Sequence, residues 1–169
     1  MLQKLSIAVT TCLFSLFIAQ ASVAQQAEAP KKTTNQLATE AMSEMLNIFN
    51  AAAKANSPDS ARAAATQINA HTVNLTTLTP LLAKSKKPTE TEMRKFAEFV
   101  LKNNTQIKTA LKRIAVLKES NTPETNSIIK TAMDSMSSKT RPLTTAINRL
   151  YPTKKMKAYI QQAKKKQAQ

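Results

Sequence analysis

The 169-residue chain contains no glycine. Glycine usually makes up about 7% of residues and supplies the positive-φ conformations and close backbone approaches that many sites need. Its absence excludes the usual forms of phosphate-binding loops, dinucleotide fingerprints, nucleophile elbows and two-residue β-hairpin turns. Alanine, lysine, glutamine, leucine and methionine are plentiful instead. This composition favours helices over sheets.

The chain has only one long apolar run, and it predicts a signal peptide at residues 1–24. Lys4 supplies a positive charge, Leu5–Ala19 is apolar, and Ser22–Ala24 places small residues where a signal peptidase cuts. A bilayer-spanning helix needs roughly twenty apolar residues, and this run is shorter. We therefore expect an exported protein, secreted or periplasmic, that is cleaved before Gln25 and carries no membrane span.

Cysteine is nearly absent as well. The only one, Cys12, falls inside the signal peptide. We therefore expect a mature chain without disulfides, thiolate nucleophiles or cysteine-based metal sites. Residues 25–33 are expected to be a disordered leader, residues 34–152 a helical domain and residues 153–169 a basic helix or tail.

Four segments carry apolar side chains at alternating spacings of three and four residues, which predicts four amphipathic helices. The stripes cover residues 38–52, 61–82, 93–117 and 129–150. Ser57 and Thr89 are the expected N-caps of the second and third helices, and the fourth is expected to begin at Thr122. Asn56 is expected to end the first helix in the left-handed conformation that glycine usually takes.

Short connections between these long helices predict antiparallel neighbours. The expected fold is therefore all-α, an up-down-up-down four-helix bundle with a short basic C-terminal helix or tail. Pro80 and Pro142 are expected to kink or end their helices, and a three-helix arrangement is the alternative if either proline redirects the chain. Phe96 and Ile107 are expected in the core, where replacement by alanine costs about 2–5 kcal/mol.

Acidic residues are scarce in the second half of the chain. Residues 84–169 contain twenty basic and six acidic residues, whereas residues 25–83 contain four of each. This asymmetry indicates an anionic partner, and the alternative is that the cations only keep the helices soluble. The expected contact residues are basic and lie on the third helix and the tail: Lys102, Lys108, Lys112, Arg113, Lys154, Lys155, Lys157, Lys164, Lys165 and Lys166.

The expected partner is an acidic protein, or an anionic envelope or cell surface that the protein contacts peripherally. Nucleic acid is disfavoured, because an exported chain with so few aromatic side chains offers bases little to stack on. A monomer is favoured. The lysines beyond Pro152 lie outside the four apolar stripes, so deletion of residues 153–169 is expected to weaken binding and leave thermal stability nearly unchanged. The alternative is that Met156, Tyr159 and Ile160 pack back onto the bundle and make the segment structural.

His71 is the only histidine and lies beside the apolar stripe of the second helix. Folding the chain about its short connections brings three residues to the level of His71: Met42, Asn103 and Thr140. We therefore expect a polar core layer of His71, Asn103 and Thr140 that fixes the helix register. The weaker alternative is a metal site using Met42, Met45 and His71, since a Met-x-x-Met spacing places two thioethers on one helix face.

Other cofactor sites fit the sequence less well. The predicted bundle resembles the haem-binding four-helix cytochromes in outline, but those proteins need an axial histidine in the last helix, which is absent here. Met133 and Met136 form a second methionine pair, expected roughly 15 Å from the first at 1.5 Å per residue, so core packing is the expected role of both pairs. No cofactor is predicted.

No set of residues in the sequence is spaced as a catalytic site would require. Glu40 with Glu44, and Glu90 with Glu92, are expected in first helical turns, where acids complement the helix dipole. We therefore predict a non-enzymatic, exported binding protein that engages an acidic partner. A periplasmic chaperone or stress protein is the first alternative, and a metal-handling protein the second.

Overall fold

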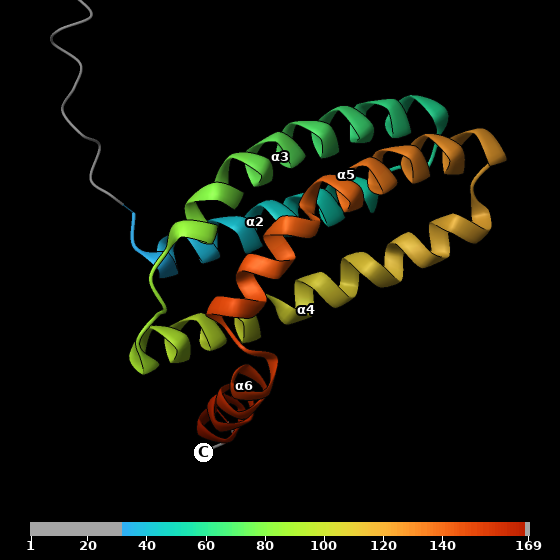
Figure 1. Ribbon diagram of the computed structural model, residues 1–169. Coiled ribbons are helices and arrows are strands. Elements are labelled where there is room, and N and C mark those ends of the chain that lie inside the picture. Colours follow the sequence, from blue (N-terminus) through green and yellow to red (C-terminus); the bar gives the residue numbers. More distant parts are fainter. Residues whose placement is uncertain (1–31, 168–169) are drawn as a thin grey trace, which may run out of the picture. The chain divides into compact units, whose positions relative to one another are not determined.

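The computed structural model describes residues 32–167, and this part of the chain is helical, without strands. Five helices follow one another (Figure 1): α2 (Thr34–Ala52), α3 (Pro58–Lys84), α4 (Glu90–Ser120), α5 (Pro123–Leu150) and α6 (Thr153–Gln167). The predicted all-α class is confirmed. The predicted signal peptide and all but the last two residues of the predicted leader lie outside the described residues.

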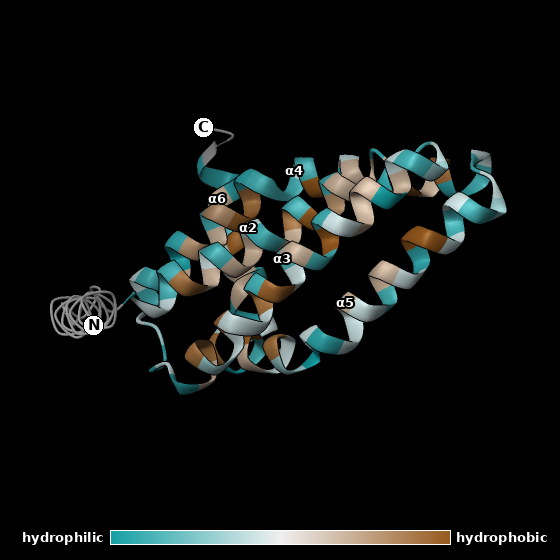
Figure 2. Cartoon of the chain, turned by 90° about the horizontal axis from the view of Figure 1, so that it is seen from above, coloured by the Kyte–Doolittle hydropathy of each residue, from teal (hydrophilic) through white to brown (hydrophobic). Residues whose placement is uncertain are grey.

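None of the helices within residues 32–167 combines the length and apolar character that a bilayer-spanning helix requires. Hydrophobic residues instead alternate with hydrophilic ones along each helix, as Figure 2 shows. Each helix therefore buries one side, as the apolar spacing predicts.

Side-chain caps fix where the helices begin. The Oγ1 atom of Thr89 accepts a hydrogen bond from the backbone N–H of Glu92, and the Glu92 carboxylate accepts one from the backbone N–H of Thr89 at 2.8 Å. The bond from the Thr89 backbone lowers the pKa of Glu92. The predicted cap at Thr89 is thus confirmed, and so is the predicted cap at Ser57. Thr33 and Gln36 form a further capping box at the start of α2, which the sequence analysis did not predict.

The predicted left-handed cap at Asn56 is wrong. No residue of the described chain has a positive φ angle. Instead, the end of α2 tightens, because the backbone N–H groups of Lys54 and Ala55 each bond the carbonyl three residues earlier. The side chain of Asn56 accepts a hydrogen bond from Ser60 and so belongs to the start of α3.

Both prolines lie inside helices that continue past them. Pro80 is followed by four more residues of α3, and Pro142 by eight more residues of α5. Proline removes one backbone hydrogen bond, to the carbonyl four residues earlier. Those carbonyls belong to Thr76, which is half-buried, and Ser138, which is exposed, so water can replace the missing donor. Neither proline ends its helix.

The helices pack in a definite set of pairs. α2 packs on α3 and on α4, α3 also packs on α5, and α4 also packs on α6. The contact surfaces contain many small side chains, with Ala38 and Ala41 of α2 and Ala61 of α3 fully buried. Small residues allow helices to approach closely, since the interaxial distance depends on the side chains at the contact.

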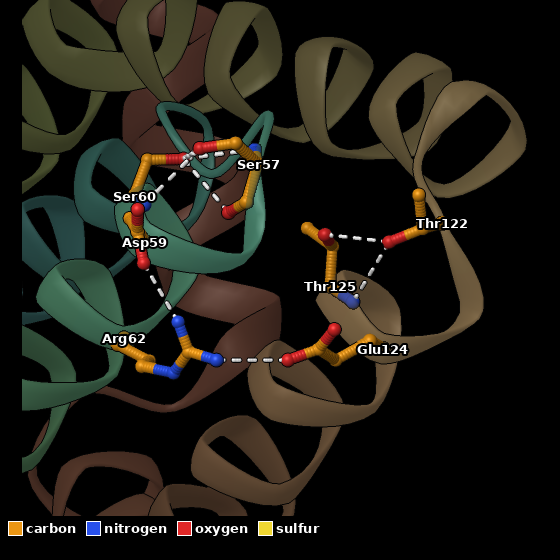
Figure 3. Close-up of polar contacts among 7 residues, drawn as sticks. All are labelled: Ser57, Asp59, Ser60, Arg62, Thr122, Glu124 and Thr125. Atoms are coloured by element: carbon orange, nitrogen blue, oxygen red, sulfur yellow. Dashed lines mark hydrogen bonds and ion pairs between the residues drawn. The ribbon is translucent and has the colours of Figure 1, made fainter.

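α3 and α5 run in the same direction, as hydrogen bonds at both ends show. Near their starts, the guanidinium of Arg62 pairs with the carboxylate of Glu124 at 2.8 Å (Figure 3). Near their ends, Arg149 of α5 donates hydrogen bonds to the carbonyls of Leu82 at 3.1 Å and Ala83 at 2.8 Å. These carbonyls lie in the last turn of α3, where helix carbonyls lack partners and cations are favourable.

The second and fourth helices of an up-down-up-down bundle also run in the same direction, so the direction of α3 and α5 does not distinguish the arrangements. The expected closed bundle is nevertheless not confirmed, because the helices pack in different pairs. Among the consecutive pairs α2/α3, α3/α4 and α4/α5, extensive packing occurs only between α2 and α3. α5 packs on α3, although only two residues connect α5 to α4. The middle of α4 is consequently less buried than its start. Phe96 is 3% exposed, as predicted for a core residue, whereas Ile107 is only half-buried.

The C-terminal segment forms α6, and its apolar side packs on α4. Met156, Tyr159 and Ala163 are each only 9% exposed. Arg94 of α4 donates a hydrogen bond to Gln162 at 2.7 Å, and its guanidinium lies 4.7 Å from the centre of the Tyr159 ring. The expectation that the tail lies outside the packed core is wrong, because the helix spacing of its apolar residues forms a face that α4 covers.

Tyr151, between α5 and α6, contacts the starts of both α2 and α4. Its ring lies 4.3 Å from that of Phe96, and its hydroxyl donates a hydrogen bond to Asn35 of α2 at 3.2 Å. Burial, together with the negative charge of Glu92, raises the pKa of Tyr151 to about 12. The ring is only 3% exposed, so ionisation of the hydroxyl opposes folding.

We expect Tyr151 to make the fold sensitive to strong alkali. The pKa of Tyr151 in the folded chain lies above its value near 10 in the unfolded chain. The contribution of Tyr151 to the free energy of unfolding is therefore complete below pH 10 and decreases as the pH rises toward 12, by at most about 3 kcal/mol. Urea unfolding at pH 9 and pH 11.5 measures this loss. A Tyr151→Phe variant removes the titrating group and controls for the lysines, so its loss over the same interval should be smaller. Equal losses in the free energy of unfolding for the two proteins would contradict the assignment of this pH dependence to Tyr151.

Deletion of residues 153–169 is expected to lower the midpoint of thermal unfolding by roughly 5–15 °C, because the packed apolar side of α6 is removed and α4 is exposed. A variant with Lys164, Lys165 and Lys166 changed to glutamine loses the charge and keeps the packing. Its midpoint should stay within about 2 °C of the parent protein, since exposed charges contribute little. A deletion without effect on the midpoint would show that α6 does not pack on α4.

Candidate functional site

All the basic side chains predicted to contact a partner are exposed. Four lie on the central and C-terminal part of α4, and we call them the α4 basic cluster: Lys102, Lys108, Lys112 and Arg113. Six lie on α6, and we call them the α6 basic cluster: Lys154, Lys155, Lys157, Lys164, Lys165 and Lys166. The packing of α6 on α4 places the second cluster on a folded helix.

One hollow between the C-terminal end of α2 and α4 is lined by cations from two separate segments, and we call it the cationic hollow. Its volume is about 540 Å³, and Lys54, in the turn that follows α2, and Arg113 of α4 both line it. The other polar side chains that line it are neutral: Asn50, Thr105, Gln106 and Thr109. No acidic residue lines the hollow. The sequence analysis predicted Arg113 and missed Lys54, which is isolated in the sequence and joins Arg113 only when α4 packs on α2.

The cationic hollow has the chemistry of an anion site. A guanidinium offers paired N–H donors that match a carboxylate or phosphate, and a lysine adds a mobile positive charge. Neutral amides and hydroxyls can complete the hydrogen bonding of such a group. An anion in the hollow would be attracted by both positive charges.

The three residues of the predicted polar layer make their hydrogen bonds elsewhere. His71 Nδ1 lies 2.6 Å from the carboxylate of Glu44 on α2. The side chain of Asn103 donates to the carbonyl of Phe99, and that of Thr140 to the carbonyl of Met136, both within their own helices. These bonds do not join His71, Asn103 and Thr140 into one layer.

Glu44 and His71 instead form a two-residue pair that fixes the register of α2 against α3. Their side chains are 17% and 27% exposed, so water screens the pair only partly. The sequence analysis placed His71 level with Met42, two residues from its actual partner. It missed Glu44 because it placed Glu40 and Glu44 in a first turn, whereas α2 begins at Thr34 and its first turn contains no acid.

The methionines contribute to packing and to a second hollow. Met42 and Met45 are half-buried against the core. Met45 also lines a hollow of about 450 Å³ together with Met136 and Thr140 of α5, so one methionine of each pair lines the same hollow. Residues 32–167 contain no group of three histidine, cysteine or acidic residues that could hold a metal ion. The metal site at Met42, Met45 and His71 stays a prediction.

A further groove lies between α4 and α5. It holds about 650 Å³ and is lined mainly by aliphatic side chains, with Lys118 and Lys130 among its polar residues. The sequence analysis did not predict it. An apolar stripe indicates that a helix face needs cover and does not say whether a neighbouring helix supplies it.

Comparison of the chain with protein families, with characterised proteins and with solved structures found no match in any of the three.

The Glu44–His71 pair is expected to contribute measurably to stability. Changing His71 to alanine leaves a mostly buried carboxylate without its partner, which costs about 1–3 kcal/mol in urea unfolding. The matched control is Lys130 with Asp134, a pair at 2.6 Å whose side chains are 77% and 65% exposed. Changing Lys130 to alanine should cost clearly less, because exposed pairs contribute little. Similar losses for the two variants would contradict the structural role of His71.

Proposed function

We propose that this chain is an exported, non-enzymatic binding protein, built on an open helical bundle, that engages an acidic partner through its basic surface. The observation that carries the proposal is the cationic hollow. Lys54, in the turn after α2, and Arg113 of α4 line the same hollow among neutral polar side chains. Cations that serve only solubility need no such convergence, since they function equally well when spread over the surface.

The α4 and α6 basic clusters support the same proposal in a different way. Exposed charges contribute mainly to the rate of encounter with an opposite charge, and salt weakens that contribution. Arg94 holds α6 against α4 through Gln162 and Tyr159, so the two clusters belong to one packed helix pair. We infer that the clusters attract the partner and that the cationic hollow binds one of its carboxylates.

The alternative is an envelope chaperone. It is favoured by four large apolar side chains that are exposed on α3 and α4: Val73, Leu81, Leu111 and Val116. A chaperone that holds unfolded clients uses apolar surface of this kind. Suppression of client aggregation that survives high salt would favour the chaperone, whereas binding that salt abolishes would favour the acidic partner.

A polyglutamate peptide is a direct probe of the cationic hollow. The double variant Lys54→Gln/Arg113→Gln should bind it at least about tenfold more weakly than the parent protein, since bonds to charged groups contribute about 1.5–3 kcal/mol. The control, Lys139→Gln/Arg141→Gln, removes the same charge from exposed positions of α5 and should lose about threefold or less. Fluorescence anisotropy at two salt concentrations measures the affinity of each double variant for the peptide.

Equal losses in the two double variants would contradict the hollow as the binding site. They would mean that binding follows net charge alone, as expected if the cations serve only solubility.

A further inference from the structure

The groove between α4 and α5, which we call the α4/α5 groove, has a continuous apolar lining contributed by three helices. Its aliphatic residues are Ala52 and Ala55 near the end of α2, Ile114 and Leu117 of α4, and Ile129 and Met133 of α5. No aromatic side chain lines it. Its volume of about 650 Å³ lies within the 300–1,000 Å³ typical of small-molecule sites.

Hydrogen bonds hold the groove at the end where α4 passes into α5. The side chain of Asn121 donates to the carbonyl of Ala55 at 2.7 Å, which fixes the turn to the end of α2. The side chain of Asn126 donates to the carbonyl of Lys118 at 2.9 Å, which ties the start of α5 to the last turns of α4. Beyond this turn α5 packs on α3, and the half-buried side chains of Ile114, Ile129 and Met133 line the space between α4 and α5.

The polar residues of the groove favour an anion. Lys118 and Lys130 both line it, together with the amides of Asn121 and Asn126, and no acidic residue does. Lys130 also pairs with Asp134 one turn further along α5, on an exposed surface that water screens. Lys118 is therefore the cation most able to meet a ligand's charged group, and the remaining N–H of each amide can donate to the same group.

The volume distinguishes between two classes of occupant. An α-helix with its side chains is about 10–12 Å wide, so one turn of 5.4 Å displaces roughly 400–600 Å³. The α4/α5 groove can therefore enclose little more than a single turn, and a longer partner helix would leave most of its surface outside the groove. A linear hydrocarbon chain is much thinner and contacts aliphatic walls along its whole length, which suits a lining without aromatic rings or buried polar groups.

We propose that the α4/α5 groove binds a free long-chain fatty carboxylate. The hydrocarbon chain lies against the aliphatic lining, and the carboxylate lies at Lys118 and the amides of Asn121 and Asn126. This site goes beyond the proposed function, because it uses none of the residues of the cationic hollow. The two sites share only α2 and α4 as walls.

Isothermal titration of the purified chain with dodecanoate, below its micelle concentration, tests the proposal. One dodecanoate per chain is expected to bind, and dodecyltrimethylammonium, with the same chain and a positive head, at least about tenfold more weakly. Ser127 and Lys118 are exposed positions of the groove. Ser127→Trp should obstruct the groove and abolish binding, and Lys118→Glu should weaken it at least about tenfold.

Leu111→Asp is the matched control, since Leu111 is exposed on α4 and does not line the groove. It should bind dodecanoate like the parent protein, and so should Lys54→Gln/Arg113→Gln, which separates this site from the cationic hollow. Thermal unfolding of each variant checks that it is folded. Absence of saturable binding, equal binding of the cationic detergent, or unchanged binding in Lys118→Glu would overturn the proposal. One-to-one binding of an acidic amphipathic peptide that dodecanoate fails to displace would also overturn it.

Discussion

The packing of α5 on α3 determines most of what is distinctive in this molecule. α5 follows α4 after two residues, yet its apolar side is buried against α3, and the two helices run in the same direction. Arg149 anchors the end of α5 on the last carbonyls of α3. Arg62 pairs with Glu124 at the other end, where both side chains are more than half exposed and the pair adds specificity more than stability.

This packing leaves α4 in contact mainly with α2 and α6. α2 covers one side and α6 another, and the side toward α5 stays open along the α4/α5 groove. The same helix provides Arg113 of the cationic hollow. α4 therefore lies between a site suited to anions and a site suited to apolar chains. Helices that serve only as core structure have little reason to leave such surfaces unpaired.

Local features of the fold could be predicted from the sequence because they depend on neighbouring residues. The helices follow from apolar spacing, and the caps at Ser57 and Thr89 follow from their own hydroxyls. The left-handed cap at Asn56 was predicted from residue preference alone. The end of α2 instead forms a tighter turn, which needs no positive φ angle.

Features that depend on helix pairing could not be predicted in this way. An apolar stripe shows that a face is buried and not what covers it, so neither the α3–α5 pair nor the meeting of Lys54 with Arg113 was visible in the sequence. α6 is an intermediate case. Met156, Tyr159 and Ala163 have helical spacing, but only the structure shows that α4 covers them.

Cysteine cross-linking tests the α3–α5 arrangement most directly. In a chain with Cys12→Ser, the pair Arg62→Cys/Glu124→Cys should react efficiently with a short bismaleimide, since the native side chains touch at 2.8 Å. The pair Arg62→Cys/Arg149→Cys should not react, because Arg149 lies 25 positions after Glu124 in α5, which is roughly 38 Å at 1.5 Å per residue. Efficient linking of Arg62 to Arg149, with none to Glu124, would contradict the parallel packing from which the α4/α5 groove follows.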